Sequence, residues 1–178
     1  MEQCNFNSVG APAMEPIVDE VAPTLNALCA CWNNLDQPAI QNLWDPKEAE
    51  PYFLPQEIKE PIIGWDKLTT YYATAQARLV RCSMRIWDVH AKLLSPGLAV
   101  ALYQMHWNGE LKSVDHLFGI DSRVTALLRN RDDQWMICHY VEAPAAPMLH
   151  LQKYYASNVD SDFLIDRPQQ SQLDQNND

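Results

Sequence analysis

The sequence has no long apolar run, little glycine and no surplus of basic residues. A membrane-spanning helix needs about 18 consecutive apolar residues, and no run in the 178 residues approaches that length. Residues 1–4 lack the basic region and following apolar stretch of a secretory signal. We therefore expect a cytoplasmic protein that does not enter membranes. The five glycines form no Gly-rich phosphate loop, so we expect no nucleotide or other cofactor.

Basic charge is scarce, because 23 Asp and Glu stand against 13 Lys and Arg, giving a net charge of −10. This excess of acid argues against a nucleic-acid partner. Residues 1–19 and 157–178 carry seven of these ten net charges, whereas residues 20–156 hold 15 acids and 12 bases. The acidity therefore belongs to the two ends, and the nearly neutral middle gives no electrostatic hint of a charged partner.

The cysteines do not have the number or spacing of a disulfide or zinc framework. The five cysteines are odd in number, and Cys29 and Cys31 fall on an expected helix, where residues two apart point in different directions. We therefore expect neither a disulfide scaffold nor a metal site. A cluster of His90, Asp88 and His106 could mimic a metal site, but the ligand spacing is not that of known zinc motifs, and a polar dimer face explains these residues more simply.

Periodicity divides the chain into helices followed by strands. Apolar residues at helical spacing predict helices at 24–36, 36–44 and 65–80, with Thr24 and Asp36 as N-caps. Four prolines between 45 and 64 favour short extended pieces at 52–54 and 58–63. Alternating residues predict strands at 82–94, 98–107, 114–128 and 134–142, and a short helix is expected around 148–155.

This order predicts a single α+β domain in which helices pack on one face of a curved antiparallel sheet. We expect a loose N-terminal lead-in at 1–22, a folded domain at 23–157 and a polar C-terminal tail at 158–178. The tail is rich in Gln, Asn and Asp and offers little apolar surface to bury.

Several segments together resemble the SnoaL-like group of the nuclear transport factor 2-like superfamily. These are residues 31–36 (CWNNLD), 64–66 (GWD), 121–129 (DSRVTALLR) and 134–140 (QWMICHY). The resemblance covers roughly 24–156. It implies a cystatin-like cone in which three N-terminal helices and a strongly bent sheet enclose an apolar pocket, and in which the free sheet face often forms a dimer. The superfamily includes isomerases, dehydratases, cyclases and non-catalytic binding domains, so the fold alone does not fix the function.

Strand alternation predicts which side chains face the core. A hairpin turn between Arg131 and Asp132 would place residue 128 opposite 135, 126 opposite 137 and 124 opposite 139, so that His139 and His116 face inward. A turn centred on Pro96 would place Trp87 on the inner face, and His90, Asp88, Gln104 and His106 on the opposite one. A bulge would exchange the faces beyond it.

His139 and His116 are therefore candidates for acid–base catalysis, because an imidazole in an apolar pocket can exchange a proton near neutral pH. Asp115 could orient an imidazole or act as a base if a bulge turns it inward. The alternative is that both histidines are core residues satisfied by a neighbouring carbonyl or hydroxyl. Candidate ligand-binding residues are the aromatics Trp32, Trp65, Tyr72, Trp87, Tyr103, Trp107 and Phe118, although such residues are often only core.

Four polar residues have simpler interpretations than catalysis. Asp36 is better explained as a helix cap than as a carboxylate at the pocket mouth. Arg123 is expected to form an exposed cross-strand pair with Glu142 or Asp121.

Two functions from different classes follow. In one, the protein is a cofactor-free isomerase, dehydratase or cyclase that acts on a small hydrophobic molecule through His139 or His116, with Tyr72 or Tyr103 polarising a carbonyl. In the other, the domain binds a small molecule or forms a homodimer through the outer face of the sheet, without catalysis.

Overall fold

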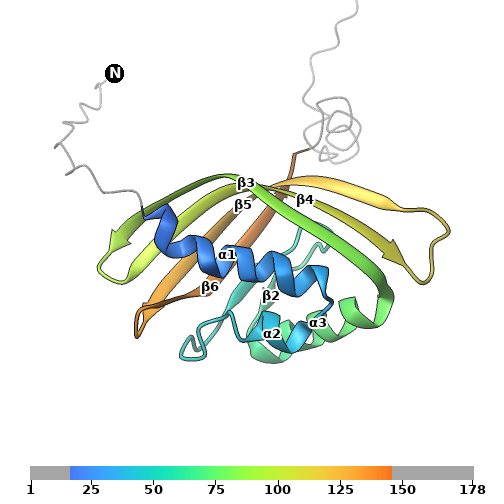
Figure 1. Ribbon diagram of the computed structural model, residues 1–178. Helices are drawn as coiled ribbons and strands as arrows, with labels where there is room; N and C mark the ends of the chain where they lie inside the picture. Colours follow the sequence, from blue (N-terminus) through green and yellow to red (C-terminus); the bar gives the residue numbers. More distant parts are fainter. Residues whose placement is uncertain (1–16, 146–178) are drawn as a thin grey trace, which may run out of the picture. The chain divides into compact units, whose positions relative to one another are not determined.

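The computed structural model describes residues 17–145, which lie within one compact unit, Met1–Ala145 (Figure 1). The elements are α1 (Val18–Asn33), α2 (Gln37–Gln41), β1 (Tyr52–Leu54), β2 (Ile62–Ile63), α3 (Trp65–Arg78), β3 (Leu79–Ser95), β4 (Leu98–Leu111), β5 (Phe118–Arg131) and β6 (Gln134–Pro144). Within these residues, no helix is long and apolar enough to cross a membrane. Three predicted segments lie outside the described residues: the helix at 148–155, the part of the lead-in before residue 17, and the C-terminal tail. The domain boundaries stay a prediction.

Six strands form one curled sheet in the order β2-β1-β6-β5-β4-β3. All neighbours are antiparallel except β1 and β6, which are parallel. In Figure 1, α1 runs along the inner side of this curl. We call the sheet face that packs against the helices the inner face and the opposite one the outer face. The predicted α+β class is confirmed, but α3 follows the two short strands β1 and β2 instead of completing an uninterrupted N-terminal group of helices.

The inner stripe of α1 consists of Val21, Leu25, Leu28 and Trp32, whose helical spacing brings them to one side. The helix begins at Val18, six residues before the predicted Thr24 cap, so that prediction is wrong. The Thr24 hydroxyl instead donates a 2.5 Å hydrogen bond to the carbonyl of Trp135 on β6.

The prediction for the second cap is confirmed. The Asp36 side chain accepts a 3.1 Å hydrogen bond from the Ala39 N–H and begins α2. Pro38 occupies the first turn of α2, where it removes no helical hydrogen bond.

The β5–β6 pairing differs from the predicted register in two ways. Asp132 and Asp133 both have positive φ, 52° and 65°, and form a two-residue turn that pairs Arg131 with Gln134. Residue 128 therefore faces 137 instead of 135. A bulge then follows, because Leu128 pairs with Ile137 while Leu127 pairs with His139, leaving the extra residue Cys138. Beyond Cys138 the inner and outer positions of β6 are exchanged.

A second bulge lies in β3. The pairs Leu93 with Ala99 and Ala91 with Ala101 match the predicted turn at Pro96, but the register shifts between Trp87 and His90. Asp88 has a positive φ of 54° at this shift. Beyond it, Ile86 is partly buried against the core and Trp87 is exposed, so the predicted inward position of Trp87 is wrong.

A buried carboxylate connects the loop after α2 to the β5–β6 hairpin. The side chain of Asp45 is fully buried and accepts hydrogen bonds from Arg131 Nη2 at 2.8 Å and from the Lys47 N–H at 2.9 Å. Arg129 reaches both Asp45, at 3.4 Å, and Glu48, at 3.0 Å. Burial alone would raise the pKa of Asp45, but the hydrogen bond and charge of Arg131 outweigh it, and the pKa is lowered.

We predict that Asp45→Asn lowers the free energy of unfolding by about 3 kcal/mol, because it removes a fully buried anion and leaves two partly buried arginine groups without it. A carboxyl with a lowered native pKa stabilises the fold above its unfolded pKa of about 4 and loses that effect as the pH falls. The difference from wild type should therefore be full at pH 7 and narrow below about pH 4. Urea denaturation across pH measures it, with exposed Glu60→Gln as control. A constant difference down to acid pH would contradict the assignment.

Candidate functional site

The two histidines predicted to face inward lie elsewhere. The Cys138 bulge turns His139 to the outer side, where its half-buried ring meets Tyr52 edge-on with centroids 5.8 Å apart. Burial lowers the pKa of His139. His116 and Asp115 are exposed in the connection between β4 and β5, because β5 begins only at Phe118. The predicted inward orientation of both histidines is therefore wrong, and the structure does not bring them together; their catalytic role stays a prediction.

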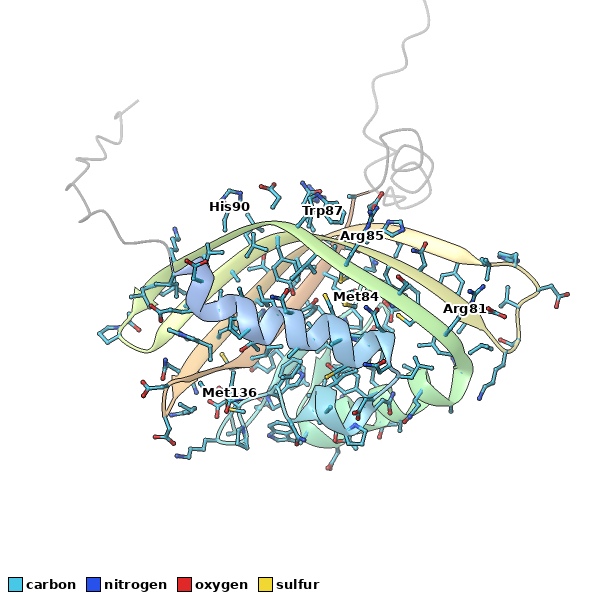
Figure 2. The ribbon with its side chains drawn as sticks, in the orientation of Figure 1. Arg81, Met84, Arg85, Trp87, His90 and Met136 are labelled. Carbon is cyan, nitrogen blue, oxygen red and sulfur yellow. The ribbon has the colours of Figure 1, made fainter. Side chains whose placement is uncertain are left out.

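The predicted ligand-binding aromatics separate into several places. Trp32, Tyr72 and Tyr103 are buried in the interior. Trp65 donates its indole N–H to the Glu48 carbonyl at 2.8 Å. Trp87 lies on the outer side of β3, as Figure 2 shows, with the Arg85 guanidinium 5.5 Å from its ring centroid.

The remaining two aromatics pack against each other. The rings of Trp107 and Phe118 have centroids 5.0 Å apart, near the ends of β4 and β5. Trp107 is also partly buried against the hydrophobic core.

The interior contains aromatic residues that the sequence analysis did not select. Phe53 on β1 lies at its centre, with its ring centroid 5.5 Å from Tyr140, 6.0 Å from Tyr72 and 5.1 Å from Tyr71. Trp44 packs against Phe53 at 6.2 Å. We call this group the aromatic interior; its members are Trp32, Trp44, Phe53, Tyr71, Tyr72, Tyr103 and Tyr140.

Hydroxyl groups in the aromatic interior are short of acceptors. Tyr103 donates to the Tyr140 hydroxyl at 3.0 Å, and Tyr140 donates to the Met105 sulfur, a weak acceptor, at 3.7 Å. The Tyr72 hydroxyl accepts from the Trp44 indole N–H at 3.0 Å. Among the described residues its own hydrogen has no assigned acceptor. Burial raises the pKa of all three tyrosines, so they remain hydrogen-bond donors at neutral pH.

Glu142 lies at the edge of this interior. It follows Tyr140 by two residues on β6, so strand alternation gives both the same face, and it is half-buried. Burial and then the nearby charge of Glu57 raise its pKa to about 8, although the Gln56 N–H, 3.5 Å from Oε2, acts in the opposite direction. Glu142 is therefore a carboxylic acid, and a hydrogen-bond donor, at neutral pH. The sequence analysis instead expected it in an exposed pair with Arg123.

Glu57 links Glu142 to an open groove. The Tyr71 hydroxyl donates a 2.6 Å hydrogen bond to Glu57 Oε1, and Tyr71 also lines a groove of about 390 Å³ beside α3. Ile58 and Ile62 supply its apolar wall. Tyr71 packs on Tyr72, with centroids 5.5 Å apart, so its side chain contacts both the groove and the rest of the aromatic interior.

The arrangement places an exposed carboxyl group, Glu57, and a half-buried one, Glu142, near buried tyrosine donors. Such pairs can give and take a proton in one reaction, and tyrosine hydroxyls can stabilise a developing oxyanion. Among residues 17–145, no three His, Cys, Asp or Glu side chains group as metal ligands; His90 pairs with Asp88 at 3.0 Å and His106 with Asp121 at 2.6 Å.

The backbone is that of the nuclear transport factor 2-like, or cystatin-like, fold. A nuclear transport factor 2-like superfamily protein from Salmonella enterica has a TM-score of 0.62 at 15% identity, covering 74% of this chain and 92% of that one. A cystatin-like protein from Caulobacter vibrioides has a TM-score of 0.63 at 14% identity, covering 79% and 97%. A ketosteroid isomerase-like protein from Erwinia carotovora has a TM-score of 0.59 at 16% identity, covering 80% and 100%.

These similarities confirm the predicted resemblance at the level of the superfamily fold, whereas the SnoaL-like group is not named among them and stays a prediction. No model of a known protein family matches the sequence. No curated protein matches it either. At such low identity the neighbours describe the fold and not the activity.

We predict that Glu142 makes the stability of the protein fall as the pH rises. A carboxyl with a raised native pKa destabilises the fold progressively between its unfolded pKa, about 4.3, and its native pKa of about 8. Glu142→Gln resembles the protonated form, so it should be more stable than wild type by about 3–5 kcal/mol at pH 9 and nearly equal at pH 4. Urea denaturation at both pH values measures this. A difference independent of pH would contradict it, and Glu60→Gln is the exposed control.

Proposed function

We propose that the protein is a cofactor-free acid–base enzyme, an isomerase or dehydratase, that acts on a small hydrophobic molecule bearing a carbonyl group. The observation that carries this proposal is Glu142, a carboxyl kept protonated at neutral pH between a second carboxyl and buried tyrosines. The acid–base role passes from His139 and His116 to Glu142, because the histidines face away from the aromatic interior.

The interior has more hydroxyl hydrogen-bond donors than acceptors, which favours a substrate with a carbonyl oxygen. The Tyr72 hydroxyl hydrogen needs an acceptor, and a carbonyl oxygen would supply one. As the substrate is deprotonated next to the carbonyl, negative charge moves to that oxygen, and a tyrosine hydroxyl in an apolar surrounding stabilises it. Tyr71 forms the gate through which a substrate in the groove reaches Tyr72.

Dehydration of a β-hydroxy ketone illustrates the proposed roles. The Glu57 carboxylate removes the proton from the carbon next to the carbonyl, and the electron pair forms the new C=C bond as the hydroxyl leaves. The Glu142 carboxylic acid donates its proton to that hydroxyl, which departs as water. In an isomerisation the proton taken by Glu57 returns to a different carbon. Similar structures include a hexachlorocyclohexane dehydrochlorinase, an enzyme named for an elimination reaction, with a TM-score of 0.61.

We predict that the protein catalyses exchange of the α-hydrogens of 2-tetralone, a flat hydrophobic ketone, with deuterium in heavy water. The exchange tests proton abstraction without knowledge of the natural substrate. Glu57→Gln should slow the exchange by about 100-fold or more, since it removes the base. The wild-type rate should fall above about pH 8, because Glu142 then loses its proton and its negative charge opposes formation of the enolate, and Glu142→Gln should remove that fall.

Proton NMR of the ketone measures these rates. Variants His139→Ala and His116→Ala are controls that should retain the wild-type rate. Equal rates in wild type, Glu57→Gln and Glu142→Gln would contradict the proposal, and a loss of exchange in either histidine variant would return the role to that histidine.

A second candidate function, a homodimerisation domain, is favoured by the outer face. Trp87, Leu94 and Leu102 are 39%, 49% and 50% exposed on β3 and β4. Arg85 and Asp88, both exposed on β3, carry opposite charges that a second copy could pair. A structure from Xanthomonas campestris with a TM-score of 0.61 is described as a candidate association domain of a calcium/calmodulin-dependent protein kinase. The proposed occupant of this face is a second copy of the chain.

We predict that light scattering after size exclusion gives the mass of a dimer, and that Leu102→Lys gives the mass of a monomer, because a buried lysine charge opposes association. Thr69→Lys, on the exposed side of α3, is the matched control and should leave the dimer intact. A monomeric wild type, or an unchanged dimer in Leu102→Lys, would contradict the outer face as the interface.

A further inference from the structure

The outer face carries a second polar cluster near the ends of β3, β4 and β5. The register aligns Arg85, His106 and Asp121 in one cross-strand row. The next row along the strands is Ser83, Asn108 and Gly119. Because alternate residues of a strand share a face, both rows lie on the same side of the sheet. This cluster is separate from Glu142 and the aromatic interior.

A cavity of about 550 Å³ lies at the second row. Arg81, Ser83 and Asn108 give it polar groups, and Leu117 gives it apolar surface. Leu117 is 63% exposed although it is fully apolar. The volume is typical of sites that hold small organic molecules. The cavity therefore offers an apolar wall beside a few hydrogen-bonding groups.

Gly119 leaves room for one of these groups. A Cβ atom at Gly119 would come within 2.8 Å of Asn108 Oδ1 and 3.6 Å of His106 Cε1. Any other residue would displace the Asn108 side chain. The glycine thus allows Asn108 to lie across the neighbouring strand, at the edge of the cavity.

A relay of hydrogen bonds fixes which end of the Asn108 amide is free. His106 Nδ1 lies 2.6 Å from Asp121 Oδ1, and His106 Nε2 lies 3.0 Å from Asn108 Oδ1. An amide oxygen only accepts, so His106 Nε2 donates to Asn108 Oδ1. Because Asn108 uses its oxygen toward His106, its NH₂ group is the end available to a ligand.

Arg81 supplies further donors at the same cavity. Its Nε lies 2.5 Å from Glu110 Oε2, which fixes the guanidinium on β3 and leaves the four Nη hydrogens for other acceptors. Figure 2 labels Arg81 on this strand. A guanidinium matches the planar shape of a carboxylate, which can accept two parallel hydrogen bonds. Arg81 and Asn108 therefore present donors of the kind that a carboxylate accepts.

We propose that this cavity binds a small carboxylate with a flat apolar body, its carboxylate at Arg81 and Asn108 and its apolar part against Leu117. Asn108 binds the ligand directly. His106 and Asp121 are positioning residues, since they act by holding the Asn108 amide. The cavity lies farther along β4 than Leu102, and none of its lining residues belongs to the exposed apolar group Trp87, Leu94 and Leu102. It therefore requires neither the dimer nor the Glu142 chemistry.

The test uses 2-naphthoate as the probe and 2-naphthylmethanol, which has the same ring system without the charge, as its control. Amide and imidazole NMR signals of the full chain are recorded during titration with each. We expect 2-naphthoate to shift signals of residues 81–83, 108 and 117–119, with saturation in the millimolar range, because ligands of this size bind with modest affinity. We also expect 2-naphthoate to shift the NMR signals of the His106 imidazole nitrogens. A histidine with only a structural role, away from any ligand, would show no such shift.

Asn108→Asp is the decisive variant. It keeps an oxygen for His106 but replaces the NH₂ donor with a second oxygen, so it should weaken 2-naphthoate binding by at least tenfold and leave 2-naphthylmethanol binding unchanged. Arg81→Gln should weaken 2-naphthoate binding as well, and it serves if Asn108→Asp does not fold. Wild-type affinity for 2-naphthoate in a folded variant of either kind would overturn the proposal. An absence of shifts at the cavity residues in the wild type would also overturn it.

Discussion

One additional residue in β6, Cys138, determines what the interior of this protein contains. A strand places alternate side chains on opposite faces, so a bulge reverses every position beyond it. Before the bulge, Trp135 and Ile137 face inward; after it, Tyr140 does so in place of His139. The hydroxyl contacts of Tyr140, and the placement of Glu142 on the same side, depend on this one shift. A regular strand would have given the interior an imidazole instead of a phenol and a carboxyl group.

The same reasoning explains how much could be predicted from the sequence. The order of helices and strands, the Asp36 cap and the pairing around Pro96 follow from spacing and local chemistry, and the structure confirms them. The sequence does not show which side chains of β3 and β6 face the interior beyond each bulge, because a bulge costs little free energy and has no strict sequence signal. Two features of the sequence could have indicated the bulges. Asp88 is a residue type that tolerates positive φ, and a shift of one residue in β6 brings the aromatic Tyr140 to the inner face.

The aromatic character of the candidate site was predicted from the sequence, but only some of its residues were. Trp32, Tyr72 and Tyr103 are interior residues, as expected from an apolar periodicity that places them on the inner side of their elements. Phe53 was missed because β1 is too short to show a period, whereas Trp44 lies in the predicted helix 36–44 but was not selected as a ligand-binding residue. Their positions come from long-range pairing: β1 pairs with β6 in parallel, and the Asp45 N–H donates to the Ile137 carbonyl at 2.8 Å. The ion pairs of Asp45 with Arg131 and Arg129 then hold this loop against the hairpin.

The polarity of the interior is the strongest argument that it is more than a core. A core optimised for stability alone would replace hydroxyls that lack good acceptors with phenylalanine, since an unsatisfied buried donor costs about 1–3 kcal/mol. Here Tyr103 donates to Tyr140, Tyr140 reaches only a thioether, and Tyr72 accepts without an assigned acceptor of its own. Glu142 adds a carboxyl whose burial raises its pKa to about 8, which lowers stability at neutral pH. Destabilising polar groups that converge on one place are typical of a site shaped by binding or catalysis, because there the missing acceptor comes from the bound molecule.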